Sequence, residues 1–332
     1  MGLLLSIFFG FVPMFFFAWF VYWLDRYEKE PAVLLGGVFI WGAVVASGAA
    51  FLVNTVLGLG IYMATGSEGA ADFTTGSLIA PIVEESLKGF AVLLVFLIFR
   101  REFDSVLDGM IYAAIAALGF AATENAYYIY TRGFQQNGYL GLAGLVFIRV
   151  VLVGWQHPFY TAFTGIGLAI SRLNKNMMIK LGAPVLGWLG AVFTHSFHNT
   201  VATIINGPSV LVVGAFFDWT GWLIMFCFAL WMLRRDRQLL VKYLRDEVAL
   251  GTLTTGQYYV ACSASAQGKA RFSALSSGNY QATNHFYQLC GELAHKKNEL
   301  INLGDEDGNA ALVARMREEM KKLSPAVAPD FG

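Results

Sequence analysis

The sequence predicts an all-α protein, a polytopic transmembrane helical bundle of about seven spans with a C-terminal soluble helical tail. Of its 332 residues, 56% are hydrophobic and 14% are charged, whereas an ordinary soluble domain has about 25% charged residues. Its mean hydropathy is +0.55. Seven apolar windows have the length of about 20 residues that a helix needs to cross a bilayer. They are residues 3–24, 32–58, 76–99, 108–130, 140–171, 179–205 and 209–233.

The first window begins at Gly2 without a preceding basic residue or a small-residue cleavage site, which predicts a retained membrane helix rather than a signal peptide. The fifth window is long enough to be bent, and Pro158 is the expected kink because proline removes a backbone donor. We therefore expect two domains: residues 1–233 in the membrane, and a cytoplasmic helical tail, residues 234–332, in which Thr254 or Thr255 is a plausible N-cap.

Basic residues lie in alternate loops, which predicts the orientation of the chain. One set of loops holds Arg26 and Lys29, Arg100 and Arg101, Arg172, Lys175 and Lys180, and then Arg234, Arg235 and Arg237. The opposite loops hold only Arg132. The positive-inside rule then places the chain in the cell membrane with the N-terminus outside and the C-terminus in the cytoplasm.

Charge and cysteine content exclude some classes of protein. The 23 basic and 23 acidic residues leave no net charge, so nothing supports a nucleic-acid partner. Cys227, Cys262 and Cys290 form no CxxC pair, and their spacing suits neither a disulfide framework nor a cysteine-bound zinc. The expected surroundings are a lipid bilayer.

Three polar sequences lie inside the apolar windows: EESLK at 84–88, FAATEN at 120–125 and HSFHN at 195–199. An ionisable group near the centre of a bilayer costs about 3 kcal/mol on insertion scales, so such groups mark a functional site by default. On a helix, Lys88 can neutralise either Glu84, four residues earlier, or Glu85, three residues earlier, and the other carboxylate then stays available for chemistry. An internal salt bridge that lets the helix enter the membrane is the alternative, but it accounts for one glutamate only.

The candidate residues share one depth. Counted from the cytoplasmic end of each window at 1.5 Å per residue, Glu84, Glu85, Glu124, His157 and His195 all lie roughly 20–25 Å deep. Independent salt bridges have no reason to share a plane, whereas a metal site requires it. Asp218 is a weaker sixth member, and Arg149 lies nearer the outer surface, where it can snorkel or offset a carboxylate.

Neutral imidazoles and a carboxylate are the usual protein ligands of catalytic zinc, and a further glutamate serves as general base toward water. On this basis Glu124, His157 and His195 are the candidate ligands of zinc or another divalent metal. Glu84 or Glu85 is the candidate base. Asn199, four residues after His195 on the same helix face, is a candidate oxyanion donor. A lone membrane histidine is more often a hydrogen-bonding group between helices than a metal ligand.

These motifs resemble those of the PrsW-type intramembrane proteases, which are related to the CAAX prenyl endopeptidases. EESLK fits the EExxK motif, FAATEN fits FxxxEN, the histidine His157 matches as well, and His195 with Asn199 in HSFHN fits HxxxN, within a motif core of residues 76–205. The resemblance implies an intramembrane endopeptidase that cuts a membrane-protein substrate, such as a single-pass anti-sigma factor, near its extracytoplasmic face. It also implies that Glu84, Glu85 and one or more of the histidines are needed. The CAAX-type members have a histidine where this chain has Glu124.

A proton- or ion-coupled membrane transporter is the main alternative, because carboxylates and histidines can also form a proton relay. Transporters often contain two related halves. The sequence shows no second copy of EExxK or HxxxN, which favours an enzyme. A seven-span scaffold or receptor is the third possibility, and it gives no reason for ionisable groups at one depth.

Overall fold

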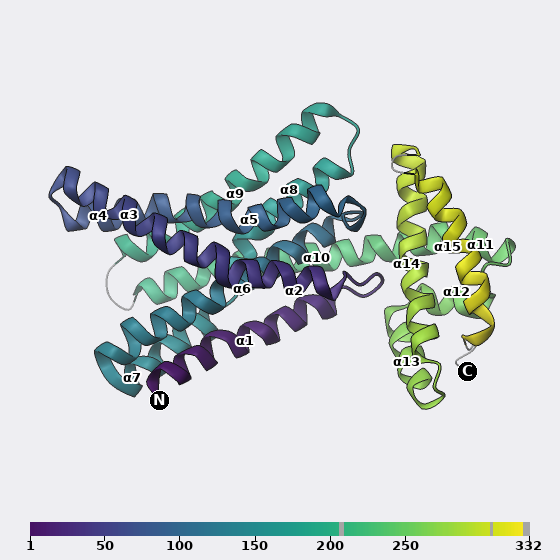
Figure 1. Ribbon diagram of the computed structural model, residues 1–332, viewed down its shortest axis with the longest axis horizontal. Helices are drawn as coiled ribbons and strands as arrows, with labels where there is room; N and C mark the ends of the chain where they lie inside the picture. Colours follow the sequence, from purple (N-terminus) through teal and green to yellow (C-terminus); the bar gives the residue numbers. More distant parts are fainter. Residues whose placement is uncertain (206–208, 306–307, 328–332) are drawn as a thin grey trace. The chain divides into compact units, whose positions relative to one another are not determined.

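The computed structural model describes residues 1–205, 209–305 and 308–327, and every regular element in these ranges is helical (Figure 1). The chain divides into two compact units. Unit 1 comprises Met1–Trp23, Glu30–Arg172 and Asn176–Phe228, and unit 2 comprises Leu24–Lys29, Leu173–Lys175 and Ala229–Gly332. The assignment of residues 1–233 to the membrane and of residues 234–332 to a cytoplasmic tail stays a prediction.

Unit 1 is built from long apolar helices joined by short turns. Its α-helices are α1 (Gly2–Leu24), α2 (Ala32–Ile40), α3 (Ser47–Thr65), α4 (Glu68–Thr74), α5 (Ala80–Ile98), α6 (Val106–Tyr128), α7 (Gln135–Val146), α8 (Gln156–Arg172), α9 (Met177–Ile204) and the first part of α10 (Ser209–Tyr243). Four π-helical segments, η1 (Trp41–Ala46), η2 (Thr75–Ile79), η4 (Ile129–Phe134) and η5 (Phe147–Leu152), continue these helices, and a short 3-10 turn, η3 (Arg100–Glu102), follows α5.

Five helical stretches in the described residues are long and apolar enough to cross a membrane, so this is a multi-pass membrane protein. They are Gly2–Leu24, Ala32–Thr65, Val106–Arg172, Met177–Ile204 and Ser209–Ala249. The third runs through a reversal at Asn137 and Gly138, where the backbone is not helical. Helix α5 is not among the five and carries three charged residues, Glu84, Glu85 and Lys88. The number of seven spans stays a prediction.

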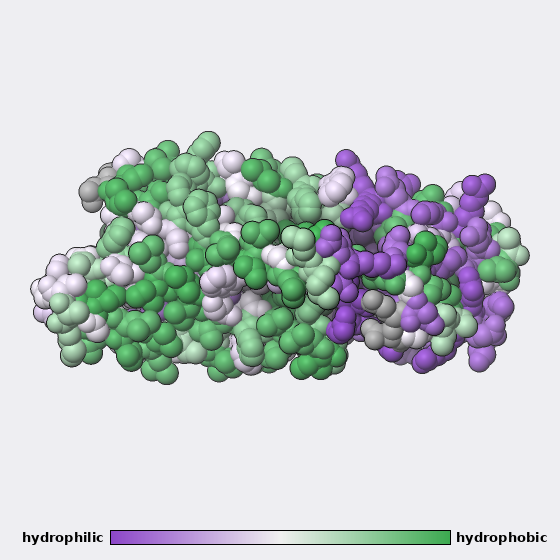
Figure 2. Space-filling model, turned by 90° about the horizontal axis from the view of Figure 1, so that it is seen from above, coloured by the Kyte–Doolittle hydropathy of each residue, from purple (hydrophilic) through white to green (hydrophobic). Residues whose placement is uncertain are grey.

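The surface of unit 1 suits a lipid environment. Large apolar side chains point outward, among them Phe16 at 66% exposure, Trp19 at 62% and Leu186 at 70%. In the space-filling view, apolar residues cover the visible face of unit 1, while hydrophilic residues gather on unit 2 (Figure 2). Exposed apolar area on this scale is typical of a protein whose solvent is lipid rather than water.

The fifth apolar window is interrupted just before Pro158 rather than kinked at it. Segment η5 ends at Leu152, and α8 begins at Gln156, so Pro158 is the third residue of a new helix. The first turn of a helix tolerates proline because its N–H groups have no intrahelical acceptor. The break places His157 at the start of α8, inside the bundle.

Helix α6 runs through the centre of unit 1, and small residues let its neighbours approach closely. A Cβ atom added to Gly165 of α8 would lie 2.0 Å from the carbonyl oxygen of Gly109 in α6. A Cβ added to Gly119 of α6 would likewise lie 2.0 Å from the carbonyl oxygen of Phe39. Small residues at helix crossings are the usual means of close packing in membranes.

Two π-helical segments offer backbone oxygens to side chains of other helices. In η1, the carbonyl oxygen of Ala43 accepts a hydrogen bond from Thr123 Oγ1 of α6 at 2.6 Å. In η2, the carbonyl oxygen of Gly76 accepts one from Asn199 Nδ2 of α9 at 2.8 Å. Single π-helical turns inside α-helices are frequent at functional sites.

Unit 2 is a small helical assembly with its own apolar core. It contains the end of α10, α11 (Arg245–Ala249), α12 (Thr255–Ala261), α13 (Ala264–Ser276), α14 (Tyr280–Leu303), α15 (Asn309–Leu323) and a short 3-10 turn, η7 (Ser324–Ala326). Thr254 caps α12 through a capping box with Gln257, which confirms one of the two predicted N-caps. The backbone of Lys29 exchanges two hydrogen bonds with the Gln288 side chain of α14, which fixes the segment Leu24–Lys29 within this unit.

Candidate functional site

The structure brings together the five ionisable residues for which the sequence predicts one common depth in the membrane. Glu84 and Glu85 come from α5, Glu124 from α6, His157 from α8 and His195 from α9. The two histidines and both residues of the glutamate pair are buried. The rings of His157 and His195 lie 5.3 Å apart, centroid to centroid. Four helices therefore meet at one polar cluster inside an otherwise apolar bundle.

Glu85 is fully engaged by protein groups. Its Oε1 atom contacts Lys88 Nζ and lies 2.8 Å from Nδ1 of His195, and its Oε2 atom accepts a hydrogen bond from Thr161 at 2.8 Å. A carboxylate that holds the Nδ1–H of a histidine turns the Nε2 lone pair of that ring outward, which is the usual arrangement behind a metal-binding histidine. Glu85 therefore orients His195 and has little capacity left for another proton.

Glu124 is held from two sides. It pairs with Arg149, and its Oε2 atom lies 2.9 Å from Nε2 of His157. Arg149 also donates to the side-chain oxygen of Asn125 at 2.9 Å, so the guanidinium spans both residues of the predicted Glu-Asn pair. Lys88 Nζ lies 3.3 Å from the other nitrogen of His157, Nδ1. With Lys88 as donor there, the ring proton lies on Nε2 and is donated to Glu124.

Glu84 differs from the other two carboxylates. Its Oε1 atom has only a long hydrogen bond, 3.5 Å, from the amide of Asn54, and its Oε2 atom lies 3.8 Å from Nε2 of His195. Among the described residues, nothing forms a hydrogen bond with Glu84 Oε2. Lys88 is paired with Glu85 and Arg149 with Glu124, so among the described residues no lysine or arginine forms a salt bridge with Glu84.

These residues fit a divalent cation. Ligand atoms of Glu84, His157 and His195 lie within 4.8 Å of one another, and Glu124 contacts Nε2 of His157. Two imidazoles with one or two carboxylates form the donor set of a catalytic zinc site. A bound cation would also offset the charge of Glu84, because a buried carboxylate without a counter-ion is costly in a low-dielectric interior.

Asn199 and Asp218, also singled out in the sequence, lie beside this cluster. The amide nitrogen of Asn199 donates to the carbonyl oxygen of Gly76. Asp218 of α10 accepts a hydrogen bond from the hydroxyl of Tyr160 at 3.0 Å and lies 2.9 Å from Nδ1 of His198. The ring of Tyr160 in turn stacks on His195 with centroids 4.9 Å apart.

Sequence reasoning missed three neighbours of the cluster, which are Asn54, Tyr160 and Thr161. Each is an uncharged polar side chain on an apolar helix, and such residues are too common to be singled out by type alone. The signal that could have found Tyr160 and Thr161 is their position three and four residues after His157, on one face of α8. No comparable signal marks Asn54, because its partner Glu84 lies on another helix.

Comparison with known proteins places this arrangement in a family. Residues 30–232 match the family described as "PrsW family intramembrane metalloprotease", and this range contains every residue of the cluster. The chain belongs to the PrsW family of intramembrane metalloproteases.

Named PrsW relatives come from several bacteria. Protease PrsW of Bacillus subtilis (strain 168) is 24% identical over 211 residues, which cover 63% of this chain and 83% of that protein. Protease PrsW of Clostridioides difficile (strain 630) is 33% identical over 115 residues, covering 33% of this chain and 46% of that protein. Protease PrsW of Geobacillus kaustophilus (strain HTA426) is 31% identical over 114 residues, covering 34% and 47%. No solved structure matches the chain.

The PrsW family membership confirms the resemblance seen in the motifs. This protein is an intramembrane protease, and it acts on a membrane-embedded substrate. The family description as a metalloprotease implies a divalent metal, in agreement with the donor set around His157 and His195. Residues 233–332 lie outside the matched range, so the role of the tail is not part of this identification.

Proposed function

We propose that this PrsW protease hydrolyses peptide bonds of membrane proteins near the extracytoplasmic face, with a water molecule that is activated by Glu84. The observation that supports the proposal best is the meeting of Glu84, Glu124, His157 and His195 inside a lipid-facing bundle. The proposed orientation is an outside N-terminus and a cytoplasmic tail. The proposed substrate is a single-pass membrane protein such as an anti-sigma factor, as the resemblance implies.

His157, His195 and Glu124 are the proposed ligands of the metal, and zinc is the metal that best suits two imidazoles and one carboxylate. The Glu124 Oε2 atom already lies at Nε2 of His157, which supports this choice of carboxylate. When bound, such a metal lowers the pKa of a water molecule and polarises a carbonyl group. Nε2 of His157 carries the ring proton in the hydrogen-bonded arrangement, so binding of a metal at this nitrogen would require that proton to leave it.

Glu84 is the proposed general base. It takes a proton from water while the water oxygen bonds to the scissile carbonyl carbon, and the proton then passes to the amine nitrogen as the C–N bond breaks. Among the described residues, none donates a hydrogen bond to Oε2 of Glu84, whereas both carboxylate oxygens of Glu85 accept hydrogen bonds. This difference supports Glu84 rather than Glu85 as the base. Glu85 is proposed instead as the residue that positions His195. The oxyanion role of Asn199 stays a prediction.

The experiment that tests the proposal is cleavage of a single-pass substrate by the purified protein, paired with measurement of bound metal. We expect Glu84→Gln to abolish cleavage and to retain bound metal, because it changes the base and not a ligand. We expect His157→Ala, His195→Ala and Glu124→Gln each to lose the bound metal and the cleavage activity. Full cleavage by Glu84→Gln would exclude this residue as the base, and loss of metal in that variant would make it a ligand instead.

The depth of the cluster also predicts where the substrate is cut. A level of roughly 20–25 Å above the cytoplasmic boundary lies in the outer half of a hydrocarbon core about 30 Å thick. Since a helix hides its carbonyl groups in backbone hydrogen bonds, the scissile segment must unwind first, and Gly, Pro or Ser near the site should favour cleavage. Moving a helix-breaking pair from the outer to the cytoplasmic third of the substrate should reduce cleavage strongly. Fragments cut in the cytoplasmic third, as identified by mass spectrometry, would contradict the depth assignment.

A further inference from the structure

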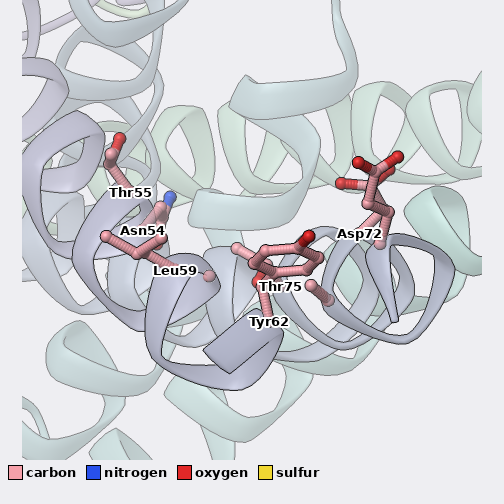
Figure 3. A pocket seen from close by; sticks show the side chains of 9 residues that line it. Asn54, Thr55, Leu59, Tyr62, Asp72 and Thr75 are labelled. Atoms are coloured by element: carbon pink, nitrogen blue, oxygen red, sulfur yellow. The ribbon is translucent and has the colours of Figure 1, made fainter. Parts of the chain in front are cut away.

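A polar pocket lies between α3 and the segment formed by α4 and η2. Its volume is about 500 Å³, and Figure 3 shows the side chains that line it. The α3 side supplies Asn54, Thr55 and Tyr62, and the other side supplies Asp72 and Thr75. No lysine or arginine lines it. A pocket of this size has room for roughly 15 water molecules at about 30 Å³ each.

The inner end of the pocket adjoins the candidate base. Asn54 lines the pocket, and its amide nitrogen lies 3.5 Å from Oε1 of Glu84. On the opposite wall, Thr75 belongs to η2, whose Gly76 is bonded to Asn199 of α9. Asn54 is therefore the side chain that stands between the pocket and the catalytic cluster.

Four buried polar atoms in this region have no hydrogen-bond partner among the described residues. They are Asn54 Oδ1, Thr75 Oγ1, Ser77 Oγ and Glu84 Oε2. Buried polar groups in folded proteins are nearly always hydrogen-bonded to protein or to ordered water. Polar cavities large enough for water are hydrated for this reason, whereas apolar cavities stay dry. The pocket and its inner end thus have the chemistry of a water-filled site.

The outer end of the pocket lies near the tip of the α3–α4 turn. Ala32–Thr65 is one stretch of 34 residues, about 51 Å long at 1.5 Å per residue, while the hydrocarbon core is about 30 Å thick. A stretch of this length extends beyond the core. Glu68 and Asp72 of α4 lie on the pocket wall near this tip, where charged side chains meet water at little cost.

We propose that the α3–α4 pocket is the route by which water reaches Glu84, and that Asn54 positions the water at its inner end. The proposal rests on the proposed function, because it supplies the nucleophile for that hydrolysis. It assigns to Asn54 a role in the chemistry through the water it holds, and it assigns to α4 and η2 the role of a wall that keeps lipid out of the route.

The first test is the rate at which introduced cysteines react with a charged, membrane-impermeant thiol reagent, in a Cys227→Ser background. Leu59→Cys and Thr55→Cys lie in the pocket, while Val56→Cys and Leu52→Cys, on the same helix, are outward-facing controls outside the pocket lining. In detergent-purified protein we expect the pocket positions to react at least tenfold faster than the controls. Equal, slow reaction at all four positions would overturn the proposed route, whatever role Glu84 has in the hydrolysis.

The second test uses cleavage. Leu59→Trp should fill the pocket and lower kcat at least tenfold with bound metal unchanged, and Val56→Trp should behave like the wild type. Asn54→Leu should lower kcat with little change in KM, and Asn54→Ser, which keeps a small polar group, should restore part of the rate. Wild-type kcat in Leu59→Trp and in Asn54→Leu would overturn the proposed route. Fast labelling of the pocket together with full cleavage by Glu84→Gln would show that water enters the pocket and would refute the proposed role of Glu84 as the base.

Discussion

Nδ1 of His195 lies 2.8 Å from Oε1 of Glu85, and this contact joins α9 to α5 at the centre of unit 1. The same oxygen contacts Lys88, so one carboxylate serves as acceptor for an imidazole and for an ammonium group. All three side chains are buried. The pair Glu84 and Glu85 is therefore asymmetric: one carboxylate is saturated by the protein, and its neighbour is not.

This asymmetry predicts different outcomes for the two glutamates. Glu85→Gln should lower metal affinity about 10- to 100-fold, because the carboxylate that orients His195 is lost. It should also destabilise the protein by about 3–5 kcal/mol, because Lys88 remains buried without its partner. Metal titration and thermal unfolding in detergent measure the two effects.

The double variant Glu85→Gln with Lys88→Met is the control. Removing the ammonium together with its partner should restore most of the stability, because no unpaired charge remains, but it should not restore metal affinity or cleavage. If metal affinity returned together with stability, Glu85 would serve only to neutralise Lys88.

The close crossing of α6 and α8 predicts a site where a single methyl group is harmful. Gly165→Ala places a Cβ atom 2.0 Å from the carbonyl oxygen of Gly109, so the two helices must separate. We expect a loss of about 1–3 kcal/mol in stability and a fall in cleavage, since His157 and Glu124 lie on these two helices. Gly182→Ala in α9 meets nothing within 4 Å and should be neutral or stabilising by up to about 1 kcal/mol. Similar melting temperatures for the two variants would contradict the crossing.

The loop charges predict an accessible α3–α4 tip and a protected tail in intact cells. A cysteine at Gly69, where added atoms meet nothing within 4 Å, should react with an impermeant reagent added outside. A cysteine at Glu318, an exposed position of α15, should react only after the membrane is opened. Labelling of a cysteine at position 318 on intact cells would contradict the proposed orientation and indicate that the tail lies outside the cell.

In unit 2, a buried carboxylate predicts sensitivity to acid. Burial pushes the pKa of Glu247 upward, but hydrogen bonds from Arg317 and Lys297 outweigh burial, so its pKa is lowered from the ordinary value of 4.5. A carboxylate with a lowered folded-state pKa adds stability above about pH 4.5, and that stability is lost as the pH falls through the folded-state value. The protection factors of the amide protons in α14 and α15, relative to the intrinsic exchange rate at each pH, should therefore fall below pH 4.5.

Glu247→Gln should lower these protection factors at neutral pH already, since Lys297 and Arg317 lose their anionic partner. Glu318→Gln is the matched control, because its pair with Lys321 is exposed and contributes less than about 1 kcal/mol. Equal protection in both variants at pH 7 would show that the buried cluster does not stabilise unit 2.

The sequence by itself determined the class of the protein and most of the polar cluster. Apolar windows of about 20 residues predict membrane helices because a bilayer offers no partner for free backbone groups. Counting along each helix from the charged loops placed Glu84, Glu124, His157 and His195 at one depth, since the rise per residue of a helix is constant. The structure brings these four residues into one cluster.

Only the tertiary structure decided how the residues at that depth are paired. Rotation of each helix about its axis and the choice of neighbours depend on packing, and sequence spacing along one helix does not specify them. In the packed bundle, Lys88 forms its salt bridge with Glu85 rather than with Glu84, and Arg149 forms one with Glu124. Asn54 of α3 donates a hydrogen bond to Glu84. The depth of a residue follows from the constant rise per residue of its own helix. The contacts that distinguish a general base from a positioning residue form between different helices, so they depend on how the helices pack in the folded bundle.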